Sequence, residues 1–289
     1  MALGAGLLAA WPFAAAGAAE ESAPSTKTVA GLEWRTDYSA AYRAAKQHQR
    51  MLLINMTCAG SQQQAVEQYI ARNPTLQAKL EQVERLRLPV DAAITVGGKS
   101  QRLLSFPAFS HLQGGPGFVM IDLRHEGQPY YGAVVSALPY ASGKYYRWNP
   151  QHLSVMLDLP PGTITQRTMI WAVRIHPERP QSTYGMHHPT LAAGAAQHST
   201  YQASIGVQGH QNFESRYHQL SGAAGGSVSE VVAESWPGQN MIDSCLDCVD
   251  SWRHSSGHWR GVSRRHRAFA FDIRRGRNGI WYGTGLFAD

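Results

Sequence analysis

Cysteine is scarce in this sequence, and the number of cysteines is odd. The 289 residues contain three cysteines, Cys58, Cys245 and Cys248. An odd number leaves at least one thiol outside any disulfide formed within the chain. Cys245 and Cys248 are close in sequence and can pair in an oxidising compartment, so we predict a local disulfide between them. Cys58 is then a free thiol that is either buried or reactive.

Long apolar runs are also lacking after the first 19 residues. From residue 20 onward no stretch reaches the ~20 apolar residues that cross a bilayer, so an integral membrane protein is not expected. Residues 1–19 are apolar and Ala-rich, are interrupted by Pro12, and end in an Ala-x-Ala-like site at residues 16–18. They predict a cleaved secretory signal peptide, although a basic leading segment is missing. We therefore expect an exported protein, periplasmic or secreted.

Charged residues are few, and the balance is basic. They make up 16% of the chain, with a net charge of +6. No nucleic-acid-binding motif accompanies the basic residues, so nucleic acid is not expected as a partner. Many arginines lie between Arg253 and Arg277, and arginine binds phosphates and carboxylates through a bidentate fork. This segment predicts either an anionic partner, such as lipid head groups or cell-wall polymers, or a simply solvated surface.

The length suits roughly two domains, and the first half has a recognisable order of elements. Its expected elements are helix 38–49, strand 50–56, helix 62–82 with a break near Pro74, strand 86–91, strand 118–123 and a closing helix at 151–157. The residues Cys58-Ala59-Gly60-Ser61 lie at the corner between the first strand and the second helix. Pro116 leads into a later strand.

This order resembles the thioredoxin-like fold over residues 31–159. The resemblance implies that Cys58 is the reactive thiol, with its thiolate stabilised by the start of the following helix. It also implies a cis peptide bond at Pro116. The chain departs from the family at Ser61, which replaces the resolving cysteine. A lone thiolate can form a mixed disulfide but cannot release the partner internally, so monothiol exchange and a binding or structural role both stay open.

Residues 160–186 begin with Pro160-Pro161 and also contain Pro177 and Pro180, and we expect them to form a linker. The remaining residues, 187–289, predict helices followed by a two-stranded hairpin turning at Asn278-Gly279. This half contains three short motifs: Gly209-His210 with Arg216 downstream, Ala233-Glu234-Ser235, and Trp252-x-x-Ser255-x-Gly257-His258.

Together these motifs resemble the CAP superfamily, the SCP-like domain of cysteine-rich secretory and pathogenesis-related proteins. The resemblance implies an αβα sandwich, so the predicted fold is a two-domain α/β chain, thioredoxin-like and then CAP/SCP-like. It also implies a ligand-binding cleft, and the cleft residues are His210, Glu234, Trp252, Ser255 and His258. Ser255 stands where many relatives have a second acid.

The cleft residues support several functions. Two imidazoles can hold zinc or another divalent cation, with Glu234 as a base, a further ligand or an orienting group. We expect a cell-envelope binding or scaffold protein whose cleft holds a cation or a small amphipathic or cell-wall ligand. Partners can be lipid, cell wall or protein. The alternatives are thiol–disulfide exchange through Cys58 and metal-assisted hydrolysis in the cleft, so whether the protein is an enzyme stays open. A hydrogen-bonded polar core is the simpler explanation of the same histidines.

Overall fold

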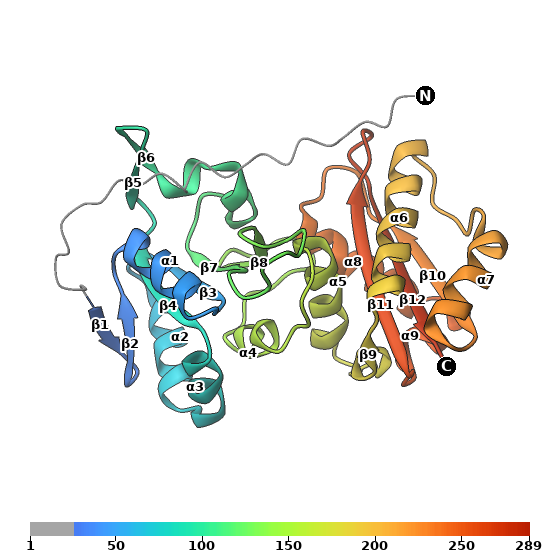
Figure 1. The fold of residues 1–289 in the computed structure, drawn as a ribbon, viewed down its shortest axis with the longest axis horizontal. Coiled ribbons are helices and arrows are strands. Elements are labelled where there is room, and N and C mark those ends of the chain that lie inside the picture. The colour runs from blue at the N-terminus through green and yellow to red at the C-terminus, as the bar shows by residue number, and fades with distance from the viewer. Residues whose placement is uncertain (1–25) are drawn as a thin grey trace.

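The computed structural model describes residues 26–289, so the predicted signal peptide at 1–19 lies outside the described residues. Two sheets lie side by side, with helices between and around them (Figure 1). The chain is therefore of the mixed α/β class, as predicted. None of the helices within residues 26–289 has the length and apolar character needed to cross a membrane.

The larger sheet belongs to the first half of the chain. Within the described residues its strands are ordered β1-β2-β4-β3-β7-β8. Strand β3 is central, pairing in parallel with β4 and antiparallel with β7. The strands are β1 (Thr26–Val29), β2 (Leu32–Arg35), β3 (Leu52–Thr57), β4 (Glu84–Pro89), β7 (Gly117–Ile121) and β8 (Val134–Pro139). A separate hairpin is formed by β5 (Ala93–Val96) and β6 (Lys99–Arg102).

Helices cover both faces of this sheet. Buried side chains of α1 (Tyr38–Gln47) and of the 3-10 segments η2 (Leu103–Ser105) and η3 (Pro107–Leu112) pack on one face. Those of α2 (Ser61–Ala71), α3 (Pro74–Glu81) and α4 (Gln151–Leu157) pack on the other. The predicted break near Pro74 is confirmed. The Asn73 side chain caps α3, and Pro74 fits its first turn because that position needs no intrahelical N–H donor.

Residues 160–186, predicted as a linker, contain a buried helix instead. Helix α5 (Ile164–Ile175) begins at a capping box formed by Thr163 and Gln166. A continuous buried run, residues 169–173, packs it between the two halves, against β8, α8 and β11. Arg167 is fully buried and donates to the carbonyl of Val135 and to the Ser136 hydroxyl on β8. The connection is therefore a packed element of the core rather than an open linker.

The second sheet is the middle layer of the second half. Among the described residues its strands are ordered β10-β12-β11-β9. They are β9 (Met186–His187), β10 (Val228–Glu234), β11 (Ala268–Arg275) and β12 (Trp281–Ala288). The predicted β11–β12 hairpin is confirmed, with Gly279 at φ +78° in the turn, a left-handed conformation that favours glycine. Strand β10 lies at an edge, paired on one side with β12.

Alternating side chains bury both faces of this sheet. Ala268 and Ala270 face α6 (Pro189–Ile205) and α7 (Phe213–Ala224). Phe269 and Phe271 face the core shared with α5, α8 (Met241–Arg253) and α9 (Ser256–Ser263). The result is three layers, helix on sheet on helix (Figure 1). One continuous core cluster contains side chains from both halves of the chain.

Candidate functional site

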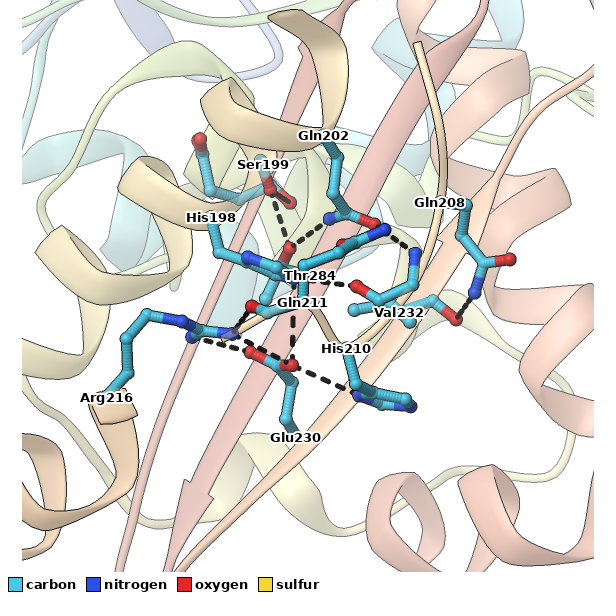
Figure 2. Close-up of polar contacts among 12 residues, drawn as sticks. His198, Ser199, Gln202, Gln208, His210, Gln211, Arg216, Glu230, Val232 and Thr284 are labelled. Carbon is cyan, nitrogen blue, oxygen red and sulfur yellow. Dashed lines mark hydrogen bonds and ion pairs between the residues drawn. The ribbon is translucent and has the colours of Figure 1, made fainter. Parts of the chain in front are cut away.

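Glu230 on β10 is the centre of a polar cluster in the second half (Figure 2). Its side chain is fully buried. Arg216 of α7 donates a hydrogen bond from each terminal nitrogen, at 2.8 Å to Oε2 and 3.2 Å to Oε1. His210 places Nδ1 3.1 Å from Oε1, and His198 of α6 places Nε2 3.7 Å from the same oxygen. Because buried charges need partners, this carboxylate depends on three surrounding basic side chains.

The strand alternation explains why Glu230 faces these partners. Val228 packs in the core cluster under α6 and α7, and Glu230, two residues on, lies on the same face. Val231 and Ala233 point to the opposite face and join the central core. A charged side chain is therefore directed into the α6–α7 layer, where Arg216 carries the opposite charge and His198 lies beside the carboxylate.

A buried hydrogen-bond network holds the loop that carries His210. Gln202 of α6 donates to the Thr284 hydroxyl at 3.0 Å and accepts from the Gly209 amide at 3.1 Å. The His198 ring contacts the Gly209 carbonyl at 2.8 Å. The left-handed Gly206 ends α6 and turns the chain into this loop. Sheet, helix and loop are thus fixed together beside Glu230 (Figure 2).

The His258 ring of α9 lies beside the His210 ring, near the edge strand β10. Their ring centroids are 5.9 Å apart, with the planes inclined by 42°. The His210 side chain is 47% exposed, so the pair is open to solvent while Glu230 behind it is not. Since Nδ1 of His210 points to Glu230, its Nε2 is the nitrogen left for another partner.

The pKa values in the cluster follow from burial and charge. Burial alone would raise the pKa of Glu230, but hydrogen bonds from His210 and Arg216 and the nearby basic charges hold it below its usual value. Burial lowers the pKa of His198, opposed by the Glu230 charge. Burial and then His210 lower the pKa of His258. A neutral His258 near pH 7 can offer a lone pair to a cation or a hydrogen-bond donor.

The predicted acid, Glu234, does not belong to this cluster. It lies four residues further along β10, about 13 Å for an extended strand, and is exposed. Glu230 takes the place that was predicted for it. The available sequence signal was a carboxylate inside the apolar run from Val228 to Ala233, since such a side chain needs a buried partner.

Two other predicted cleft residues have supporting positions. Trp252 is fully buried in α8, with its ring 5.9 Å from that of Phe271, so its side chain belongs to the core and does not line a cleft. Ser255 is the residue preceding α9, and its backbone carbonyl accepts from the Trp259 amide. It therefore helps to start the helix that presents His258.

The histidines alone are compatible with a cation shared between them. Two imidazoles bound to one zinc at ~2.0–2.1 Å have ring centres about 5 Å apart, close to the observed separation. A carboxylate that orients the first imidazole through its other nitrogen is a common feature of such sites. Within residues 26–289 no group of three or more His, Cys, Asp or Glu side chains is arranged to hold a metal.

The cysteines and Pro116 differ in part from the predictions. Cys58 is exposed and follows β3 just before α2, the predicted corner. Cys245 and Cys248 are free thiols, not a disulfide. Both are buried in α8, where burial raises their pKa well above the ordinary value and keeps them protonated. The peptide bond before Pro116 is trans, since the described residues contain no cis bond.

Comparison with known proteins adds no relatives. No protein-family model, curated protein or solved structure matches the chain.

Proposed function

We propose that the chain combines a thioredoxin-like first half with a CAP/SCP-like second half. The strand order β2-β4-β3-β7-β8, with β7 and β8 antiparallel to their neighbours, supports the first assignment. The helix-sheet-helix layering and the closing hairpin support the second. Within that second fold, Ser229-Glu230-Val231 then has the place that the sequence analysis gave to Ala233-Glu234-Ser235, four residues later.

The proposed function is binding at the edge of β10, in a protein exported to the cell envelope. His210 and His258 form the binding surface for a divalent cation or a small cell-wall ligand, and Glu230 orients His210. The observation that carries this proposal is the contact of 3.1 Å between His210 Nδ1 and the buried Glu230 carboxylate. A carboxylate in this position fixes the ring and raises the basicity of Nε2.

Exposure and charge further support a binding role. The two rings are accessible, whereas Glu230, Arg216 and His198 behind them are largely enclosed. Such an arrangement separates a rigid supporting layer from a solvent-facing pair of ligands. With two protein ligands, a cation keeps coordination positions for water or for a ligand oxygen, so it exchanges readily.

The test is a zinc and cobalt titration followed by isothermal calorimetry at pH 7.5. The wild-type chain is expected to bind one cation, and His210→Ala and His258→Ala each weaken binding at least tenfold. His254→Ala is the matched control, because that histidine is exposed directly after α8 and lies outside the cluster. Equal affinities in all four proteins would refute the cation site. Metal-assisted hydrolysis in this cleft requires the same cation, so the same result would also refute that function.

A second candidate function, thiol exchange, is favoured by the exposure of Cys58. The thiol lies at a strand-to-helix corner, and Gly60 precedes α2 without a side-chain cap. Incubation with glutathione disulfide is expected to form one mixed disulfide on the native wild-type chain and none on Cys58→Ser. Mass spectrometry of the intact protein measures the adduct. The buried Cys245 and Cys248 serve as internal controls that react after denaturation, and labelling at either of them in the native chain would contradict this view.

A further inference from the structure

A cavity of about 260 Å³ lies where the two halves of the chain meet. Ser110 and His111 of η3 line it from the first half. From the second half it is lined by the loop before α8, the first residues of α8, and two residues of the β11–β12 hairpin. It shares no residue with the Glu230 cluster, and the proposed functions leave it unused.

Arg275 and Trp281 form one wall of this cavity. They are directly opposite each other across the hairpin, so their side chains project from the same face of the two strands. The Trp281 indole is partly buried and is held in place by its Nε1, which donates to the Gln239 carbonyl at 3.0 Å. Arg275 is exposed and forms no ion pair with any residue in the part of the chain that the structure describes. A fixed aromatic plane thus lies beside an unneutralised guanidinium.

Gln239, which also lines the cavity, has an unused hydrogen-bond donor. Its Oε1 accepts from the Trp236 amide at 3.2 Å. Its Nε2 is buried and has no partner among residues 26–289. A buried donor without an acceptor costs free energy, so a rotation of the Gln239 side chain that brings Nε2 to a ligand oxygen is favourable.

The start of α8 adds two backbone donors. The Asn240 side chain accepts from the Asp243 amide, and the Asn240 carbonyl accepts from Ser244. Met241 and Ile242 line the cavity, and their amides have no acceptor within the described residues.

The acid in the first turn of α8 already has hydrogen-bond partners of its own. The nearest acid in sequence, Asp243, already accepts from Asn240 and from the backbone amides of residues 144–146. Burial lowers the pKa of His111, so this histidine is neutral near pH 7 and adds no charge of its own. The cavity is therefore rich in donors, carries one unpaired cation and has one flat apolar wall.

We propose that this cavity binds a small organic carboxylate with a planar body. The carboxylate accepts from the Gln239 amide, the start of α8 and Arg275, and the planar body packs against Trp281. The volume lies just below the ~300–1,000 Å³ typical of drug-sized ligands, so the ligand is about the size of a substituted benzoate. Because both halves line the cavity, its occupant also bridges them.

The experiment measures the binding of benzoate, benzamide and inorganic phosphate by ligand-observed NMR titration. Benzoate is expected to bind at least tenfold more tightly than benzamide, since benzamide has the same plane without the charge. Arg275→Gln is expected to weaken benzoate binding about tenfold. Arg277→Gln is the matched control, because Arg277 is exposed at the tip of the same hairpin and does not line the cavity.

A second variant tests the location without disturbing the core. Ser110 is exposed at the cavity wall, and Ser110→Trp is expected to abolish benzoate binding while the melting temperature stays unchanged. Equal binding of benzoate and benzamide, or equal effects of Arg275→Gln and Arg277→Gln, would overturn the proposal. Binding of phosphate without binding of benzoate would also overturn it, because the site would then recognise a simple anion and not a planar carboxylate.

Discussion

The Tyr146 backbone amide donates to the Asp243 carboxylate at 2.8 Å, across 97 positions of the chain. The same carboxylate accepts from the amides of Lys144 and Tyr145, so three consecutive residues of the first half are hydrogen-bonded to the start of α8. Asn240 donates a fourth hydrogen bond to it. One side chain therefore satisfies several donors at the junction of the two halves.

Replacing Asp243 by Ala should loosen this junction. It leaves three backbone amides without their acceptor and is expected to lower the free energy of unfolding by about 3 kcal/mol. Urea denaturation followed by fluorescence measures the change. Asp250→Ala, an exposed acid on the same helix, should stay within ~0.5 kcal/mol of wild type. A similar loss in both variants would mean that helix charge, and not the junction, is responsible.

Arg167 should be a second position of high sensitivity. Its buried guanidinium donates to the carbonyls of Val135, Leu159, Pro160 and Met156. Burial lowers its pKa to about 10, so it stays charged near pH 7. Arg167→Met leaves those carbonyls unpaired and is expected to cost about 3 kcal/mol, measured by thermal and urea unfolding.

Lysine cannot restore the planar fork of Arg167, so Arg167→Lys should also destabilise the protein, by about 2 kcal/mol. The exposed Arg43 on α1 provides the control through Arg43→Met. Wild-type stability in Arg167→Lys would show that charge alone is sufficient at this position.

Glu230 should contribute stability in a pH-dependent way. Its folded-state pKa is lowered, so its contribution is complete above its unfolded value of about 4.3 and is lost as the pH falls through the folded value. Glu230→Gln is expected to lower the free energy of unfolding by about 2 kcal/mol at pH 7 and by progressively less below pH 4. Calorimetric unfolding across pH 3–8 measures the difference.

Glu234→Gln is the matched control on the same face of β10 and should have little effect at any pH, because Glu234 is exposed. A pH-independent loss in Glu230→Gln would indicate that packing, and not the charge of the carboxylate, stabilises the cluster.

His152 should make the protein less stable in mild acid. The ring lies among Tyr146, Trp148 and Trp171, and its Nδ1 is buried with no partner in residues 26–289. Burial lowers the pKa of His152 from 6.5 to about 4. Because the unfolded chain then binds more protons between these values, stability is complete above pH 6.5 and is lost as the pH falls toward 4, by roughly 3 kcal/mol.

His152→Phe keeps an aromatic ring in this site and removes the titrating group. The slope of unfolding free energy against pH, between pH 4 and 6.5, should decrease while stability at pH 7 is retained. The exposed His254, changed to Phe, should leave the slope as in wild type. An unchanged slope in His152→Phe would assign the acid sensitivity to other groups, such as His187, whose pKa burial lowers to a similar value.

Features that depend on neighbouring residues were predictable from sequence. The break at Asn73-Pro74 follows from an amide side chain that caps a helix and a proline that can begin one. The hairpin turn at Asn278-Gly279 follows from the left-handed conformation that glycine accepts. The corner at Cys58 follows from a short apolar run that gives way to a polar helix.

Features that depend on distant contacts were not predictable in the same way. Glu230 and Glu234 lie on one face of β10, and their spacing alone does not tell which one meets Arg216 and His198. Cys245 and Cys248 have a spacing that permits a disulfide, yet core packing buries both as thiols. Neither choice is encoded within a few residues of the side chain concerned.

By itself, the sequence determined the mixed α/β class and the approximate bounds of the main helices and strands of the first half. The family resemblance, and not the local sequence, is what singled out the pair His210 and His258. Tertiary structure decided that Glu230, and not Glu234, supports that pair. It also placed the buried helix α5 where a linker was expected, and it joined the two halves through Asp243. The physical reason is burial. The charge state of a carboxylate, the reactivity of a thiol and the packing of an apolar helix depend on the groups that surround them once water is excluded. The fold brings those groups from distant parts of the chain.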